Sequence, residues 1–349
     1  MAKKRVAVLF GGASKDYAAS LQSAYSVICA LSREKYDVIP IGITRAGRWL
    51  FFPGDYNEIP SGVWEQNSDC CSAVISPDPH HGGIIKILAN GEFTHQRIDV
   101  IFPVLHGKYG ECGRIQALCR LSGIAFAGSG FDAANACCDR MLTYLLLERA
   151  GIKVPKYYYI ERAWLDNIDK YIPMIEAEIG YPMYVRASSQ SNSIGTNTAA
   201  DREELRAAIK IAASHHHKIL AEQCLEGREL ECAVTGGSYS TKASVVGEIK
   251  PTRGTKTDLM EKTSELVVAK LKKSLQNEVA QTAKAAFVAL GCKNFARFNF
   301  VLTDDGLYLR KAGAMPGFTE VSVFPALMKE SGCGYAELLD MIIESVTGA

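Results

Sequence analysis

The stretch from Leu309 to Thr319, LRKAGAMPGFT, decides how the rest of this chain is interpreted. The apolar residues that lead into it, from Gly306 to Leu309, predict a strand, and the sequence PGFT at its end predicts a turn. Two adjacent cations, Arg310 and Lys311, lie between the strand and the turn. What these cations do depends on the residues that the remainder of the chain brings near them.

The composition is that of an ordinary globular protein. The chain has 349 residues, 48% hydrophobic and 22% charged, which is enough for two or three domains with cores of their own. The formal net charge of +1 excludes a broad attraction to nucleic acid or to an anionic membrane. The N-terminal apolar run is too short for a signal peptide, and no apolar run approaches the roughly 20 residues that span a bilayer. We therefore expect a cytoplasmic protein.

The cysteines predict neither a metal site nor a disulfide framework. The chain has 11 of them, and they lack the CxxC spacing of zinc sites. We expect free, mostly buried thiols in a reducing compartment. The run from His215 to His217 falls at a predicted helix end, where adjacent side chains point in different directions, so we expect a solvated face there.

Strands and helices alternate in the first third of the chain. This alternation predicts a parallel, doubly wound sheet that meets its ligands at the carboxyl ends of the strands. The expected strands are 5–10, 36–43 and 98–105, and the expected helix is 20–31. A boundary near 127–130 precedes one expected helix over 132–150. The last part, from residue 218, contains an expected helix over 275–290 and an expected strand over 295–302.

The strongest local motif is VLHGKYGECG, from Val104 to Gly113. A strand that ends in His-Gly and continues through glycine turns places an imidazole, His106, and a carboxylate, Glu111, at the end of the sheet. Such a pair supports proton transfer or the binding of an amino acid. A glycine turn with incidental polar residues is an equal alternative, and the motif alone does not decide between them.

Two weaker motifs accompany it. The loop GGASKDYAASL, from Gly11 to Leu21, exposes backbone N–H groups that can bind a carboxylate or phosphate, although a purely structural turn is as good an interpretation. The segment EQCLEGRE, from Glu222 to Glu229, carries two acids that solvent alone could explain.

Together these motifs resemble those of the ATP-grasp ligases that join D-alanine to D-alanine or to D-serine. The family patterns HGxxGEDG, GGxSxExEVSL and ExxxxGxE have counterparts here in the same order, over essentially the whole chain. The segments IPIGITR at 39–45 and VIFPVLHG at 100–107 are similar to the vancomycin-resistance branch that uses D-serine. The resemblance implies a three-domain α/β ATP-grasp ligase fold with a doubly wound N-terminal parallel sheet, and a homodimer. We expect an N-terminal substrate domain over 1–128, a central ATP-grasp subdomain over 129–217 and a C-terminal catalytic domain over 218–349.

The resemblance also implies roles for individual residues. Asp16, one methylene shorter than the family's Glu, is expected to hold the ammonium group of the first D-amino acid. Arg140 and Arg186 replace two lysines that grip the ATP phosphates, which preserves the charge but not the shape of the contact. The expected substrate-binding residues are Asp16, His106, Glu111, Gly317 and Ser322; the expected ATP-binding residues are Arg140, Arg186, Glu222, Glu229, Lys262 and Lys311; the expected catalytic residues are Arg297, Ser193, Asp16, His106 and Glu111.

The three magnesium ligands that the resemblance implies have all been replaced. Asn299 occupies the position of an Asp, Lys311 that of a Glu and Gly313 that of an Asn. The exchange shifts the local charge by roughly three units toward positive, which repels a divalent cation. The lid around Lys262 is short and lacks its tyrosine, and Cys112 stands in place of the Asp of HGxxGEDG. We therefore predict no metal ligand.

Two functional interpretations remain. The favoured one is a degenerate ligase homologue of peptidoglycan precursor synthesis, with weak or no activity, that can still bind ATP. The alternative is an active ligase with an unconventional metal site, in which ATP phosphorylates D-alanine and a second D-amino acid attacks the acyl phosphate. In both interpretations the partners are a nucleotide and D-amino acids, with no nucleic acid and no membrane.

Overall fold

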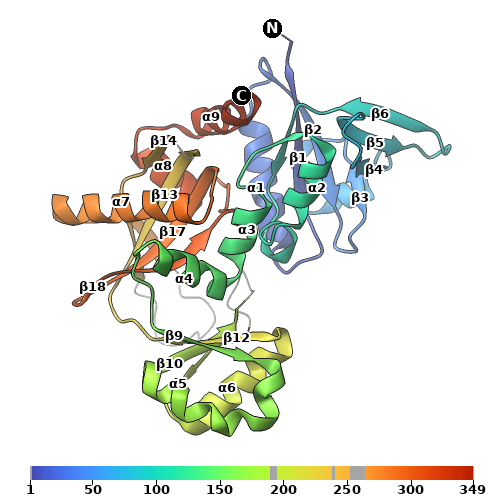
Figure 1. Ribbon diagram of the computed structural model, residues 1–349. Helices are drawn as coiled ribbons and strands as arrows, with labels where there is room; N and C mark the ends of the chain where they lie inside the picture. The colour runs from blue at the N-terminus through green and yellow to red at the C-terminus, as the bar shows by residue number, and fades with distance from the viewer. Residues whose placement is uncertain (1, 189–194, 238–239, 252–263, 349) are drawn as a thin grey trace.

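The computed structural model contains three β-sheets that follow one another along the chain (Figure 1). It describes residues 2–188, 195–237, 240–251 and 264–348. Within these ranges, no helix is both long enough and apolar enough to cross a membrane.

The N-terminal sheet has the strand order β6-β5-β4-β3-β2-β1-β7-β8. Its parallel half consists of β1 (Lys4–Gly11), β2 (Tyr36–Ile43), β7 (Val100–Pro103) and β8 (Ala125–Phe126). Buried apolar residues cover both faces of β1, since Val6 and Val8 belong to one core cluster and Ala7 and Leu9 to another. Helices α1 (Tyr17–Ala30) and α2 (Arg114–Ser122) complete the parallel part. A continuous apolar strand with both faces covered is typical of parallel sheets, as the sequence predicts.

The other half of this sheet is antiparallel, whereas the alternation of strands and helices predicted a parallel sheet. Strands β3 (Trp49–Phe51), β4 (Cys71–Ile75), β5 (Gly83–Ile87) and β6 (Phe93–Arg97) form an antiparallel meander. Short turns join β4 to β5 and β5 to β6, which allows antiparallel but not parallel pairing. The predicted parallel sheet is therefore correct only for β2, β1, β7 and β8.

The single helix expected over 132–150 is two helices. Helix α3 (Phe131–Cys138) ends where Asp139 adopts an extended conformation, and α4 (Arg140–Arg149) begins immediately after it. Asp139 Oδ1 accepts hydrogen bonds from the backbone N–H groups of Met141 and Leu142, at 3.1 and 3.3 Å. The aspartate therefore caps α4 and interrupts the helical path, because a capping residue requires a non-helical backbone.

The second sheet has the order β11-β10-β12-β9 and is all antiparallel. Helices α5 (Ile172–Ile179) and α6 (Arg202–His215) share a hydrophobic core with it. Its strands are β9 (Tyr157–Glu161), β10 (Met183–Ala187), β11 (Asn197–Ala199) and β12 (Lys218–Gln223). The expected boundary at 217/218 falls inside this sheet, because β12 is hydrogen-bonded to both β9 and β10.

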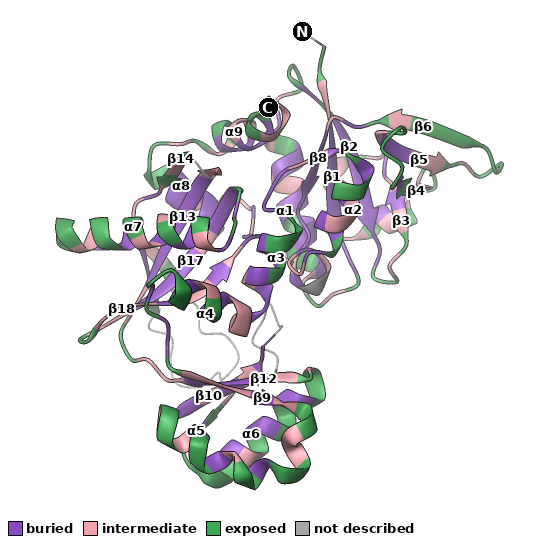
Figure 2. Cartoon of the chain, viewed as in Figure 1, coloured by how far each residue is buried: buried purple, intermediate pink, exposed green. Residues whose placement is uncertain are grey.

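The third sheet has the order β16-β15-β13-β17-β18, with β14 paired to β13. Helix α7 (Lys273–Ala289) lies along it, and α8 (Val323–Glu330) and α9 (Tyr335–Thr347) follow it. Residues of α9 share a core with α1 and β1, so the C-terminus returns to the N-terminal sheet (Figure 1). Figure 2 shows β13 and β17 of this sheet largely buried and the outward side of α7 exposed. The strands are β13 (Arg228–Gly237), β14 (Ser240–Ala243), β15 (Gly247–Pro251), β16 (Ser264–Val268), β17 (Asn294–Thr303) and β18 (Gly306–Gly313).

Candidate functional site

A cavity of about 260 Å³ lies where the N-terminal domain meets the third sheet. Six of the predicted site residues line it: Asp16, His106, Glu111, Arg297, Lys311 and Gly317. Met315 and Pro316, directly before Gly317, complete the same wall. The structure thus brings together residues that are up to about three hundred positions apart in the sequence.

His106 and Asp16 come from the carboxyl-terminal end of the parallel sheet. His106 follows β7, and its Nε2 lies 3.3 Å from Ser23 Oγ. Burial lowers the pKa of the His106 imidazole, while the charge of Asp16 opposes this change. Gly107 has φ +69°, and a Cβ there would lie 2.6 Å from Asp16 Oδ2, so only glycine lets the loop pass this close to the carboxylate.

Glu111 is held at the end of the same loop. Its Oε1 accepts a hydrogen bond from the backbone N–H of Gly107 at 2.8 Å. Burial raises the pKa of this carboxyl group, whereas that hydrogen bond and the positive charge of Lys311 lower it. Glu111 therefore faces the cation of β18, and the expected amino-acid site and the expected metal site share a boundary.

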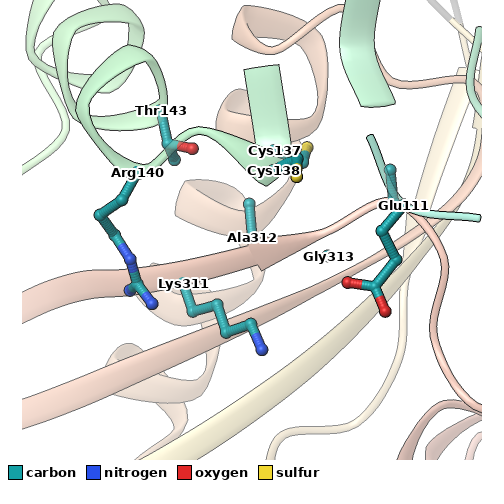
Figure 3. Close-up of a pocket in the computed structure, with 9 residues that line it drawn as sticks. Glu111, Cys137, Cys138, Arg140, Thr143, Lys311, Ala312 and Gly313 are labelled. Atoms are coloured by element: carbon teal, nitrogen blue, oxygen red, sulfur yellow. The ribbon is translucent and has the colours of Figure 1, made fainter. Parts of the chain in front are cut away.

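Lys311 reaches the cavity because β18 contains a β-bulge. Asn299 pairs with Lys311 but Phe300 pairs with Leu309, so Arg310 is the extra residue. A bulge of this kind changes the direction in which its side chains point. Figure 3 shows the side chains of Lys311 and Glu111 extending toward the same space, with Arg140 on the other side of Lys311. Burial, together with the positive charges of Arg140 and Arg297, lowers the pKa of Lys311 to about 8.

The three positions of the expected metal ligands lie side by side in the sheet. Asn299 pairs directly with Lys311 and with Glu231 on β13, and Arg297 pairs with Gly313. The Asn299 amide donates to Glu231 Oε1 at 3.2 Å and accepts from Arg310 Nε at 2.9 Å. Both ends of the amide are therefore occupied by protein groups.

These residues do not fit a magnesium ion. Asn299 Oδ1 is the only side-chain oxygen at the three positions, and it already accepts from a guanidinium group. Lys311 has no acceptor atom, and Gly313 has no side chain. Magnesium needs carboxylate oxygens together with water and phosphate. Within the described part of the chain, no group of three or more His, Cys, Asp or Glu side chains could hold a metal ion.

The predicted ATP-binding residues form a second group, next to the bulge. Glu222, of which 2% of the side chain is exposed, makes an ion pair with Arg186 and accepts from the Tyr144 hydroxyl at 2.6 Å. Arg140 donates to the backbone carbonyl of Arg310. Nearly buried charges of this kind are tolerated because each has a partner of opposite charge or a hydrogen bond.

Arg310 contacts both the expected metal-ligand positions and the expected ATP-binding residues. Its guanidinium group lies 3.1 Å from Glu229 Oε1, the residue expected to bind ribose, and also donates to Asn299. Glu231, Arg310 and Tyr144 were not among the predicted site residues. The period-2 alternation of β13 could have indicated Glu231, because Glu229 and Glu231 share one face of that strand.

Some predicted residues lie elsewhere. Ser322 caps the turn behind Gly317, where its Oγ accepts from the Thr319 backbone N–H at 3.1 Å, and it does not line the cavity. Ser193 and Lys262 lie outside the described residues, so their predicted roles stay predictions.

The expectation that all cysteines are free thiols is wrong. Cys112 and Cys138 form a disulfide whose Cα atoms lie 5.4 Å apart. The sequence did not predict this pairing because the two residues are 26 positions apart and meet only when the loop packs on α3. The other cysteines are free.

Comparisons with known proteins agree with this architecture. Residues 5–129 match the family described as D-ala D-ala ligase N-terminus, and residues 146–344 match D-ala D-ala ligase C-terminus. The D-alanine–D-alanine ligase of Acetivibrio thermocellus is 36% identical, over 98% of this chain and 95% of the relative. The vancomycin/teicoplanin A-type resistance protein VanA of Enterococcus faecium is also 36% identical, over 98% of each chain.

A solved structure extends the comparison to the fold. The crystal structure of VanG D-Ala:D-Ser ligase from Enterococcus faecalis has a TM-score of 0.91 and 31% identity, covering 99% of this chain and 100% of that one. The family and the ATP-grasp ligase fold predicted from the sequence are thus confirmed. This chain belongs to the D-alanine–D-alanine ligase family.

Proposed function

We propose that this chain is a D-alanine–D-alanine or D-alanine–D-serine ligase homologue that binds ATP but has little or no magnesium-dependent turnover. The observation that carries the proposal is the row Glu231–Asn299–Lys311 across β13, β17 and β18. The amide in this row is bonded to Glu231 and Arg310, and the lysine stands where the family has a carboxylate. A metal-dependent phosphoryl transfer therefore lacks its protein ligands.

The cations of the cleft support nucleotide binding. Arg140, Arg186, Arg310 and Lys311 lie near one another, the resemblance implies that Arg140, Arg186 and Lys311 contact ATP, and guanidinium groups suit phosphate oxygens. Each is partly neutralised by protein groups, as Arg186 is by Glu222 and Arg310 by Glu229. Binding of ATP would exchange some of these internal contacts for contacts to phosphate. The ribose hydroxyls would compete with Arg310 for Glu229.

The amino-acid part of the cleft keeps more of the family's chemistry. Asp16 supplies a carboxylate for an ammonium group, and Arg297 supplies a cation for a carboxylate or a tetrahedral intermediate. Burial lowers the pKa of His106, which favours the neutral imidazole, the form that accepts a proton. These groups support a D-amino acid as the ligand here, with D-alanine and D-serine as the substances to test. Homodimer formation and a cytoplasmic location stay predictions.

Lys311 can supply positive charge to a phosphate, but it cannot replace a metal in the reaction. A metal ion bridges two phosphate oxygens and holds the attacking and leaving groups in line. One ammonium group neutralises charge without fixing that geometry. We therefore expect binding to survive better than turnover.

The first test measures phosphate release from ATP with magnesium, D-alanine, and either D-alanine or D-serine, alongside calorimetric ATP binding with magnesium or with EDTA. We expect no amino-acid-dependent release and equal ATP affinity in both conditions. Release that depends on both amino acids would establish the alternative, a working ligase. No ATP binding would leave a protein without nucleotide function.

A second test rebuilds the expected ligands. The triple variant Asn299→Asp, Lys311→Glu, Gly313→Asn should gain magnesium-dependent ATP turnover. The same variant carrying Arg297→Ala is the matched control, and it should lose that turnover again because the transition-state cation is gone. If the triple variant binds ATP but does not turn over, the loss lies outside these three positions.

A further inference from the structure

We propose that Cys112 and Cys138 form a reversible thiol–disulfide site that fixes the loop 107–113 to helix α3 and so controls the position of Glu111 in the cleft. The consequence for ligand binding rests on the proposed function, whereas the redox site itself does not. The partner it implies is a dithiol reductant.

The bond connects two parts of the candidate site. Cys112 directly follows Glu111, and Cys138 is the last residue of α3, directly before the Asp139 cap and Arg140. Cys138 lines a cavity of about 20 Å³ together with Glu111, Arg140 and Lys311 (Figure 3). A cavity of this size holds about one water molecule. The disulfide therefore lies between the residues expected to bind the amino acid and the residues expected to bind the ATP phosphates.

The loop also approaches the first residue of α3, at the end of the helix opposite Cys138. Gly113 has φ +85°, and a Cβ there would lie 2.8 Å from the Phe131 ring, the first residue of α3. The Gln116 side chain donates to the backbone carbonyl of Gly110 at 2.7 Å, which supports the loop from α2. Without the covalent bond, the loop would keep these two contacts, the hydrogen bond from Gly107 N–H to the Glu111 carboxylate, and backbone hydrogen bonds that include Gly110 and Glu111 N–H to the Gly107 carbonyl. The disulfide adds to these contacts the one covalent restraint on the residue next to Glu111, and its removal frees the loop to move relative to α3.

The chemistry of reduction suits this location. Cys112 is partly exposed and Cys138 is buried, so a thiolate from the reductant reaches the Cys112 sulfur first. Attack there forms a mixed disulfide at Cys112 and releases Cys138 as a thiolate near Arg140 and Lys311, which stabilise its charge. The second thiol of the reductant then breaks the mixed disulfide. Overall, two electrons and two protons pass to the protein, and the reductant becomes a disulfide.

A neighbouring pair of thiols provides an internal control. Cys137 Sγ lies 3.8 Å from Cys292 Sγ, but the two are not bonded. The hydrogen bond with Cys292 and burial raise the pKa of the Cys137 thiol well above its usual range. A thiol that stays protonated reacts slowly, so Cys137 should not take part.

The test compares the oxidised and the dithiothreitol-reduced full-length protein. Alkylation of the unfolded chain, followed by mass measurement, should label nine of the 11 cysteines without reductant and all of them after reduction. Hydrogen exchange of peptides covering 107–113 should become at least about tenfold faster on reduction. Cys112→Ser should exchange like the reduced protein without any reductant. Cys137→Ser should keep the full response to dithiothreitol.

The proposal fails if all 11 cysteines are labelled without reductant, or if exchange in 107–113 is the same in both redox states. ATP binding is measured on the same two samples. Absence of binding in both would refute the proposed nucleotide function, while the exchange result would still decide the redox site.

Discussion

The lowered pKa of Lys311 predicts that this side chain destabilises the folded protein at neutral pH. The pKa falls from 10.5 to about 8 because the ammonium group is buried beside Arg140 and Arg297. The folded state therefore binds the Lys311 proton more weakly than the unfolded state does. Below pH 8 the lysine is charged in both states, and the folded state bears the full cost. Between pH 8 and 10.5 the folded protein loses the proton first, so stability rises with pH.

The size of the effect follows from this difference in pKa. A change of one pKa unit corresponds to about 1.4 kcal/mol, so the neutral variant Lys311→Met should be more stable than the parent by about 3 kcal/mol at pH 7. At pH 10 the lysine of the folded parent is already neutral, and the gain should shrink to below about 1 kcal/mol.

The measurement is the free energy of urea unfolding of parent and variant at pH 7 and at pH 10. Lys329→Met is the matched control: Lys329 pairs with Glu320 on the surface, with 61% of its side chain exposed, and should show little change at either pH. A Lys311→Met protein that is destabilised, or equally stabilised at both pH values, would refute the electrostatic argument. The expected result would identify Lys311 as a cation kept at a cost in stability, as is common at ligand sites.

Three further predictions follow from the same contacts. Glu222→Gln leaves the buried Arg186 without its counter-charge and should lower the free energy of urea unfolding by about 3 kcal/mol, whereas Glu229→Gln, at a half-exposed pair, should cost much less. Asp139→Ala removes the α4 cap and should cost about 1–2 kcal/mol at pH 7. Burial opposes ionisation of Asp139, but hydrogen bonds from Ser188 and Lys218 lower its pKa overall. The stabilisation by the ionised carboxylate should therefore be lost on acidification below about pH 4, which a series of melting temperatures against pH would show. Added magnesium should leave ATP affinity unchanged in calorimetry, and a strong increase would contradict the absence of metal ligands.

Local pattern was enough for most individual elements. The predicted strand 36–43 coincides with β2, and the helix expected over 275–290 is α7 shifted by two residues at its start and one at its end. Such elements are identifiable because their apolar periodicity is continuous and long. The helix over 132–150 was wrong at one residue, Asp139, since its cap depends on the local backbone and on partners from β12 and the Ser188 region. Partners this far away in the sequence cannot be identified from the residues around Asp139.

Some residues of the candidate site could likewise be predicted from the sequence, and others could not. His106 and Glu111 could be singled out because they follow a strand of the parallel sheet, where ligands gather, and the family resemblance assigned them to the amino acid together with Asp16, Gly317 and Ser322. Arg310 was not chosen, because its role arises from a bulge that shifts the pairing by one residue. Glu231 gains its meaning only from strand pairing, which places it opposite Asn299.

The sequence by itself determined the family, and it determined that Asn299, Lys311 and Gly313 stand at the three positions where the resemblance implies magnesium ligands, because these depend on residue identity and spacing along the chain. Only the tertiary structure decided which groups the charged and polar side chains of the site meet. It sets Glu231 against Asn299 and Arg297, Arg310 against Glu229, and Cys112 against Cys138. The physical reason is that electrostatic and covalent pairing depend on distance in space, and the fold brings together groups that the sequence keeps far apart.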